Sequence, residues 1–528
     1  MPDSDVVARD RSTVVAVPAG ARSAPAAVPP FAWRDAGLVA ALAAALFTAR
    51  VGRYPLGGDE LYFIAAGHRP AFGYADQGPV VPLLAAAADL LAPGSAVLLR
   101  LPAVLLTVVA ILLSAAVARE FGGGRGPQAL AAAAYAATPM AVTQSAMLST
   151  FAVDVTLTGL VAWLWIRWVR TRSDRLLLLA GLVAAVDFQV KWLVPIVWAG
   201  LTVGVAVFGP RDMLRRPAWW GGSALLVASA IPTVRWQQAH GWPQLAMGAV
   251  VRAEQLATSG LAGMPMQIVQ VTGPLGLLLL VGMWAGLRWD RLRHYRFVIP
   301  MVAIGLVGVV AGGLRPYFVA GAFPGLFAAG AVYLADRELS RRVRAAGAGL
   351  LALATAVTVT AVLVLPLPTA RMTEPTDRYS QIDWRSRLYG SSGWDRLVTT
   401  VTEAVRRIPP EERRDLVIVT QNYWQAAALE RSGSDTLPRV YSPNRGYGYF
   451  GPPPDSASTV LYVGVDDPRT ALRTEFAAAT PVARIDERLG FPSVDRGVTL
   501  WHCGFPSEPW SRAWPRMRTL PMVDGTVR

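Results

Sequence analysis

The chain has 528 residues, of which 53% are hydrophobic and only 16% are charged, and its mean hydropathy is +0.37. This composition excludes an ordinary soluble protein and is typical of one that crosses a membrane several times. The net charge of +14 does not indicate nucleic-acid binding, because the arginines form short clusters between apolar runs instead of covering one face. The one cysteine, Cys503, excludes an intrachain disulfide framework and a cysteine-based zinc site, and we interpret it as a free structural thiol.

Residues 1–32 combine proline, alanine, serine and charged residues, which predicts a disordered cytoplasmic tail without a cleavable signal peptide. Beyond this tail, residues 33–366 contain eleven apolar windows that are long enough to be membrane helices. The windows lie near residues 33–50, 97–117, 128–146, 151–168, 176–190, 193–209, 218–236, 267–287, 297–312, 317–335 and 346–366. A shorter apolar run at 80–93 contains Pro82 and Asp89, so we interpret it as a helix on the membrane surface.

Arginines gather in alternate connections between these windows. The five clusters are Arg119 and Arg125; Arg167, Arg170, Arg172 and Arg175; Arg211, Arg215 and Arg216; Arg288, Arg291, Arg293 and Arg296; and Arg337, Arg341, Arg342 and Arg344. The positive-inside rule places all five connections in the cytoplasm. The N-terminus is then cytoplasmic, whereas a first outer loop at 51–96, a second at 237–266 and the chain after residue 366 lie outside.

The composition changes at residue 367. Short runs rich in β-branched residues predict strands, and amphipathic stretches between them predict helices. The strands are expected at 415–420, 459–465, 482–486 and 497–503, and the helices include 394–408 and 468–479. Strands that alternate with helices predict an extracytoplasmic α/β domain at 367–528 with a partly parallel sheet.

The first outer loop gathers Asp59, Glu60, His68, Arg69 and Asp76 in a chain that is otherwise poor in charge. Carboxylates just outside the hydrocarbon layer can stay ionised, so they suit a base or a metal site at the membrane surface. Acidic residues that only solvate a surface turn would give the same pattern.

This loop resembles the first outer loop of family 39 glycosyltransferases, the bacterial relatives of protein O-mannosyltransferases and lipid A aminoarabinose transferases. The segments GGDELYFIAAG at 57–67 and GYADQGPVVPLLA at 73–85 carry the resemblance. It continues in VLLRLPAVLL at 97–106, STFAVDVTL at 149–157, VKWLVP at 190–195, RWQQAHGWPQL at 235–245, RPYFVAGAFPGLFAAGA at 315–331, QNYWQAAAL at 421–429 and YSPNRGYGYFGPPP at 441–454. Three positions depart from the family pattern: Gln77 replaces a frequent His or Lys, Gly78 a frequent Pro, and Trp424 a usual Gly.

The resemblance implies a GT-C fold with about eleven membrane helices. It also implies an inverting glycosyltransferase that moves a sugar from a polyprenyl-phosphate carrier to a hydroxyl of a glycan, lipid or protein on the outer face of a bacterial cytoplasmic membrane. The alanine- and arginine-rich, lysine-poor composition is consistent with an actinobacterial source and a cell-wall acceptor. The segment at 441–454 suits a loop that stacks on a sugar or caps the site, and equally a plain surface loop.

By the same resemblance Asp59 is the expected base. Glu60 is expected either to support it through a hydrogen bond or to be solvated. Asp76 is similar to an acidic residue that helps to hold a divalent metal (Mg, Mn, Ca or Zn) in some relatives, and His68 is a conceivable second ligand. Both residues could instead be solvated loop residues.

Several further residues are candidates for binding substrate. Arg100, Lys191 and Arg315 are expected near the outer ends of membrane helices, where they either neutralise the carrier phosphate or reach to lipid headgroups. Asp154 begins an apolar window, so it either faces the cavity or pairs with an arginine. The remaining candidates are Tyr317, which is either an aromatic near the phosphate or one of the membrane-interface belt, and Tyr74 and Gln77 of the loop motif.

Two rival functions share these features. A transporter or flippase of lipid-linked sugars would also have an apolar groove and membrane-embedded charge, but it would usually show inverted repeats and broken helices near the bilayer centre. A non-catalytic scaffold relative is the other alternative, because Gln77 and Gly78 depart from the family pattern.

Overall fold

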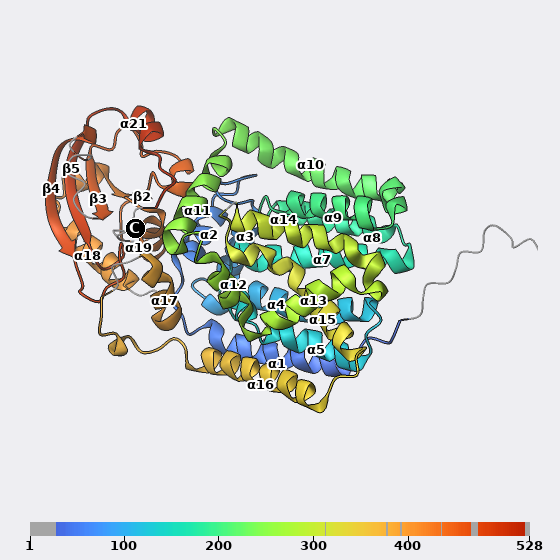
Figure 1. Cartoon of the computed structure of the whole chain (residues 1–528). Coiled ribbons are helices and arrows are strands. Elements are labelled where there is room, and N and C mark those ends of the chain that lie inside the picture. Colours follow the sequence, from blue (N-terminus) through green and yellow to red (C-terminus); the bar gives the residue numbers. More distant parts are fainter. Residues whose placement is uncertain are drawn as a thin grey trace, which may run out of the picture.

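The computed structural model describes residues 28–522 except 312, 376–378, 391–392, 434–435, 466–471 and 473. The predicted tail therefore lies outside the described residues, apart from residues 28–32. Helices make up most of residues 33–364, and a five-stranded sheet with its own helices follows at one end of the helical bundle (Figure 1).

All eleven apolar windows are helical. Seven are single helices: α1 (Trp33–Val51), α4 (Ala96–Glu120), α7 (Thr150–Thr171), α8 (Arg175–Phe188), α9 (Val194–Phe208), α10 (Pro217–Ala239) and α16 (Arg341–Val364). Four are divided into two or three pieces: α5 (Arg125–Ala136) with α6 (Pro139–Ala146), α12 (Met264–Thr272) with η2 (Gly273–Leu275) and α13 (Gly276–Arg288), η3 (Asp290–Val298) with α14 (Ile299–Val310), and η4 (Pro316–Ala322) with α15 (Phe323–Ala335).

The division between α5 and α6 has a local cause. Pro139 cannot donate the hydrogen bond that a continuous helix requires, and it is well suited to the first turn of a new helix. The Thr138 hydroxyl caps that turn by accepting from the Ala141 amide at 3.2 Å.

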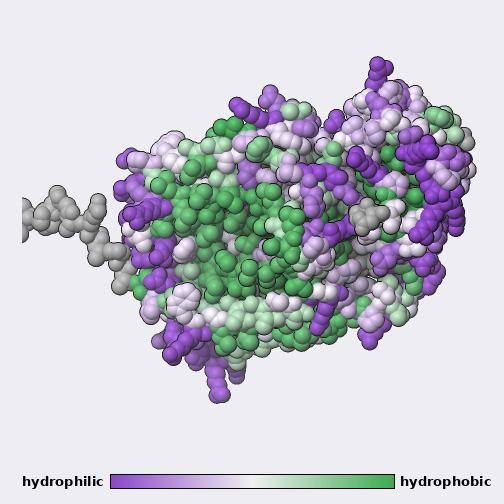
Figure 2. Space-filling model, turned by 180° about the vertical axis from the view of Figure 1, so that it is seen from behind, coloured by the Kyte–Doolittle hydropathy of each residue, from purple (hydrophilic) through white to green (hydrophobic). Residues whose placement is uncertain are grey.

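Six helical segments of the described residues are long and apolar enough to cross a membrane. They are Ala96–Glu120, Thr150–Thr171, Met264–Arg288, Asp290–Val310, Pro316–Ala335 and Arg341–Val364. The space-filling view shows a broad apolar area over the helical part, with hydrophilic residues at both ends (Figure 2). This arrangement is that of a multi-pass membrane protein, because an apolar belt between polar ends matches the hydrocarbon core of a bilayer.

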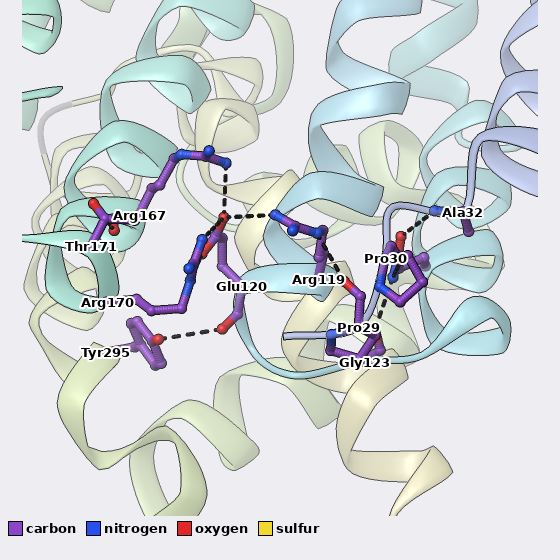
Figure 3. A network of polar contacts seen from close by, with 11 residues as sticks. Pro29, Pro30, Ala32, Arg119, Glu120, Gly123, Arg167, Arg170, Thr171 and Tyr295 are labelled. Atoms are coloured by element: carbon purple, nitrogen blue, oxygen red, sulfur yellow. Dashed lines mark hydrogen bonds and ion pairs between the residues drawn. The ribbon is translucent and has the colours of Figure 1, made fainter. Parts of the chain in front are cut away.

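The arginine clusters meet at the end of the bundle away from the sheet. Figure 3 shows the Glu120 carboxylate, which is fully buried, between Arg170 at 2.7 Å, Arg167 at 3.1 Å and Arg119 at 3.5 Å. The other clusters are linked to this one by contacts of Arg172 with Asp212 at 2.7 Å, and of Arg291 with the Gly122 carbonyl at 3.1 Å and Asp336 at 2.9 Å. The five clusters therefore lie at one end of the bundle, as the positive-inside argument requires.

The first outer loop is largely helical. It contains α2 (Gly58–Gly67) and α3 (Val80–Leu91), which pack on each other. The α3 helix matches the predicted surface helix, and its Leu90 and Leu91 are exposed. The second predicted loop is also helical, because α10 runs on to Ala239 and α11 (Pro243–Ser259) follows. A search for long apolar windows misses α11, because this helix is only weakly apolar.

The C-terminal domain comprises α17 (Tyr379–Tyr389) through α21 (Trp510–Met517). Between them lie α18 (Trp394–Arg407), β1 (Leu416–Thr420), α19 (Tyr423–Gly433), β2 (Val440–Tyr441), η7 (Arg445–Tyr449), β3 (Thr459–Val465), β4 (Phe476–Ile485) and β5 (Val498–Pro506). The strand order is β2-β1-β3-β5-β4. The first three strands are parallel and the last two pairings are antiparallel, so the prediction of a partly parallel sheet is confirmed.

One predicted element of this domain is wrong in part. The stretch 468–479 was expected to be a helix, but β4 already begins at Phe476 and pairs with β5. Its alanines favour a helix when isolated, and pairing with the exposed edge of β5 overrides that preference. Cys503 on β5 is free and buried, as expected.

Candidate active site

The α2 helix and the C-terminal domain meet at Asp59. Tyr423 Oη donates to Asp59 Oδ1 at 2.6 Å, and Trp424 Nε1 donates to the same oxygen at 2.9 Å. Both donors are neutral groups, a phenol and an indole. Among the described residues Asp59 Oδ2 has no hydrogen-bond partner, and Asp59 is half-buried. The expected base therefore has one fixed oxygen and one open oxygen.

A series of hydrogen bonds and ion pairs leads from Tyr423 to Arg315. Arg445 Nη1 donates to Tyr423 Oη at 3.2 Å, and Arg445 Nη2 pairs with Glu254 of α11. Glu254 is buried and also lies 3.6 Å from Arg315, another of the predicted residues. Asp59, Tyr423, Arg445, Glu254 and Arg315 thus form one connected network that joins α2, α11, η4 and the C-terminal domain.

Asp76 lies beside this network. Tyr62 Oη donates to Asp76 Oδ1 at 3.0 Å. Burial raises the pKa of Asp76, and the nearby Asp59 raises it further, whereas the charges of Arg445 and Lys191 and the Tyr62 hydrogen bond lower it. The structure therefore brings the two acidic residues of the predicted site close together.

Lys191 also belongs to this group of predicted site residues. Burial lowers the pKa of Lys191, as does the neighbouring charge of Arg315, while Asp154, Asp76 and Asp59 raise it. Its ammonium lies 4.9 Å from the centre of the Phe318 ring, and among the described residues no carboxylate forms an ion pair with it. Lys191 is thus a cation with open coordination in the same site.

Asp154 and Tyr317 interact electrostatically with this group. Asp154 is buried in α7, and its Oδ1 has no hydrogen-bond partner in the described chain. It interacts electrostatically with Lys191 and with Asp187 of α8, whose Oδ1 is also unpartnered. Tyr317 packs against Phe151 at 4.6 Å between ring centres. The expected alternative, an arginine partner for Asp154, is not found among the described ion pairs.

Glu60 and Arg100 form a separate, structural pair. Arg100 donates to both Glu60 oxygens, at 2.8 and 2.6 Å, and its remaining donors reach the carbonyls of Val51, Tyr54 and Pro55. Both side chains are buried. This geometry argues against the phosphate contact expected of Arg100, because no N–H of its guanidinium is left over. It likewise places Glu60 in the support of α2, not beside the open oxygen of Asp59.

His68 is also placed differently from the expectation. Its Nε2 lies 2.9 Å from Asp89, which is held in turn by Arg431 at 2.7 Å. No group of three or more His, Cys, Asp and Glu side chains in the described residues could hold a metal ion. His68 and Asp76 thus contact different side chains, and a divalent metal held by both stays a prediction.

The two remaining loop residues have different surroundings. Tyr74 Oη lies within hydrogen-bonding distance of the carbonyls of Ala66 and Arg69, at 2.9 and 3.0 Å, and its one proton can be donated to either, so the hydroxyl holds the loop. The Gln77 side chain is buried, and its Nε2 has no partner among the described residues. Gln77 therefore keeps a free donor, whereas Tyr74 does not.

Sequence reasoning missed Tyr62, Tyr423, Arg445, Glu254 and Asp187. The segments that contain Tyr423 and Arg445 carry the family resemblance, which was the available signal. Their pairing with α2 spans more than 360 residues, since Tyr423 and Asp59 are 364 positions apart, and no pattern in the sequence specifies such a contact.

Comparison with known proteins agrees with this architecture. The family model described as dolichyl-phosphate-mannose-protein mannosyltransferase matches residues 76–236. No curated protein sequence matches the chain. Among solved structures, ArnT from Cupriavidus metallidurans bound to undecaprenyl phosphate is similar with a TM-score of 0.55 and 14% identity, over 88% of this chain and 97% of that one.

Two further structures show the same fold. The apo state of the same ArnT gives a TM-score of 0.57 at 13% identity, again over 88% of this chain and 97% of that one. AglB, the oligosaccharyltransferase of Archaeoglobus fulgidus in complex with an inhibitory peptide and a dolichol-phosphate, gives 0.50 at 12% identity, over 81% of this chain and 69% of that one. The chain has the fold of the GT-C membrane glycosyltransferases, and the suspected resemblance is confirmed at that level.

Proposed function

We propose that this protein is a membrane glycosyltransferase that takes a sugar from a polyprenyl-phosphate carrier and passes it to an acceptor hydroxyl. The observation that carries the proposal is the placement of Asp59. Its carboxylate has an open oxygen in a polar site, beside the cations Lys191 and Arg315, where an apolar helical bundle meets the C-terminal domain. The GT-C fold and the lipid-linked carriers named for ArnT and AglB support the same reading.

The proposed reaction involves one proton transfer and one leaving group. The acceptor oxygen attacks the anomeric carbon and forms the new glycosidic bond, and its proton passes to Asp59 Oδ2. The bond between the anomeric carbon and the phosphate oxygen breaks, and its electron pair remains on the phosphate. Attack from the side opposite the leaving group inverts the anomeric centre.

The leaving phosphate gains negative charge as this bond breaks, so fixed cations stabilise the transition state. Lys191 suits this task because no carboxylate within the described chain is paired with it. Arg315 contributes from the position just before η4, and Tyr317 lies two residues further along, inside η4. The unpartnered oxygen of Asp154 and the free amide of Gln77 are suited to hydroxyls of the sugar.

The membrane, the orientation of the chain and the acceptor are inferred from the arginine pattern and the composition. The eleven helical windows would cross a bacterial cytoplasmic membrane, with the arginine-rich end in the cytoplasm and the C-terminal domain outside. The acceptor would be a cell-wall glycan, a lipid or a secreted protein. The lysine-poor, arginine-rich composition supports an actinobacterial cell-wall acceptor among these.

The test uses purified full-length protein in proteoliposomes with a panel of radiolabelled polyprenyl-phosphate sugars and extracted cell-wall glycan as the acceptor. The wild type should transfer label to the glycan, and Asp59→Asn should lower kcat by about 10²–10⁴-fold without changing the melting temperature. Movement of label across the bilayer without a new glycosidic bond would indicate a flippase instead. Full transfer by Asp59→Asn would remove Asp59 as the base.

A further inference from the structure

The C-terminal domain supplies the two donors that hold Asp59. They are adjacent residues at the start of α19, and both reach Asp59 Oδ1 from outside the membrane bundle. A carboxylate on a half-exposed helix end can normally rotate about its last side-chain bond. Two hydrogen bonds to one oxygen remove that freedom and leave the other oxygen in a defined direction.

The donors themselves are rigid. Tyr423 is buried, its ring meets Tyr62 edge-on at 5.3 Å between centres, and its hydroxyl also accepts from Arg445. The Trp424 indole lies directly on Gly58, where an added Cβ would be only 2.2 Å from the indole Cγ. Glycine at 58 is therefore what allows the indole to approach the backbone next to Asp59.

Ion pairs connect the helix that carries the donors to the segment that follows α2 and to α3. Glu430 of α19 receives two hydrogen bonds from Arg69, at 2.8 and 3.1 Å, and Arg431 reaches Asp89 of α3 at 2.7 Å. Tyr447 of η7 donates to Glu430 at 2.8 Å. These contacts fix the position of Tyr423 and Trp424 without touching Asp59.

We infer that Tyr423 and Trp424 are positioning residues that hold Asp59 Oδ1 so that Oδ2 faces the acceptor hydroxyl. The C-terminal domain is then a part of the active site, because the base is correctly oriented only when this domain is docked on α2. Arg445 acts one step further away, by fixing the Tyr423 hydroxyl that it donates to. This inference rests on the proposed glycosyl transfer and on Asp59 as its base.

The experiment compares Tyr423→Phe and Trp424→Phe with wild type in the proteoliposome assay. Each variant keeps an aromatic ring and loses the donor, so we expect kcat to fall about 10- to 100-fold, the size of effect that misplacement of a catalytic group produces. KM for the polyprenyl-phosphate sugar should stay the same, because neither donor contacts the predicted phosphate site. The matched control is Tyr135→Phe, which removes a buried tyrosine donor, bonded to Gln144 at 2.8 Å inside the helical bundle, and should keep the wild-type kcat.

A double-mutant cycle separates positioning from general structural support. If Tyr423 acts through Asp59, adding Tyr423→Phe to Asp59→Asn should cause no further loss of the residual rate. A structural role would lower the melting temperature and would add to the Asp59→Asn defect, which would overturn the inference.

The failure of the inference can be told apart from failure of the proposed function. An active wild type, an impaired Asp59→Asn and two Phe variants with wild-type kcat would overturn only the positioning role. A wild type that forms no glycosidic bond with any donor of the panel would overturn both.

Discussion

Carboxylates at the two ends of the molecule have opposite surroundings. At the arginine-rich end, Glu120 is fully buried and three arginines lie within 3.5 Å of it. At the other end, Asp59 is half-buried, is held by two neutral donors on one oxygen and has no partner for its second oxygen within the described part of the chain. A carboxylate whose oxygens are saturated by cations supports structure, whereas one that keeps its charge and an open lone pair can accept a proton.

Glu60 gives the same comparison within a single turn. It follows Asp59 in the chain, yet both of its oxygens bind Arg100, and they also accept from the Gly57 and Leu148 amides at 3.0 and 3.3 Å. Successive residues of a helix point about 100° apart, so one carboxylate faces the site and the next faces the protein interior. Substitutions of Glu60 and Glu120, which are held by arginines, and of residues in the candidate site test this comparison.

The largest effect on stability is expected for Glu60→Gln. The substitution leaves the buried Arg100 without its counter-charge, which costs about 3–5 kcal/mol of the free energy of unfolding. Thermal unfolding in detergent should show a large drop in melting temperature. Protein that remains folded should keep most of its activity. An unchanged melting temperature would contradict the structural assignment of this pair.

Glu120→Gln should have a smaller effect. The arginines around it are partly exposed, and water can solvate them, so the expected loss is about 1–2 kcal/mol of unfolding free energy. The activity per folded molecule should be that of the wild type. A fall in kcat with an intact melting temperature would show that the two ends are coupled in a way that the contacts do not indicate.

Lys191→Met tests the role of the Lys191 ammonium, which forms no ion pair with a carboxylate of the described chain. Methionine keeps most of the length of the side chain and removes its charge, so binding of the carrier phosphate should weaken by about tenfold, equivalent to one charge-assisted hydrogen bond of about 1.4 kcal/mol. Titration of the protein with undecaprenyl phosphate, followed by thermal shift, measures this. Arg172→Met at the opposite end is the control, and equal binding by Lys191→Met and wild type would exclude Lys191 from the phosphate site.

The smallest effect concerns pH. Burial raises the pKa of Asp76 above its ordinary value of 3.8. The folded state therefore binds this proton more tightly than the unfolded state, so the contribution of Asp76 is present below pH 3.8 and is lost as the pH rises through the raised pKa. Asp76→Asn should make the melting temperature less dependent on pH in that range. An unchanged pH dependence would show that Asp76 is solvated.

The sequence predicted the apolar helices and the arginine-rich end because hydrophobic length and arginine bias act over whole segments. It placed every apolar window in a helix and the arginine clusters at one end. It failed where a contact joins distant residues: Arg100 at the end of an apolar window looks the same whether it binds a phosphate or Glu60. The docking of Tyr423 on Asp59 and the strand at Phe476 depend on tertiary contacts, which local patterns do not encode.

Gly446 has a consequence for the exchange of domains between relatives. A Cβ at this position would lie 1.7 Å from the Tyr62 hydroxyl oxygen, so no side chain fits between η7 and α2. A chimera that joins this helical bundle to another C-terminal domain must keep a glycine opposite Tyr62. Without it, the graft would be held away from the bundle, and the hydrogen bond of Tyr423 with Asp59 would be lost.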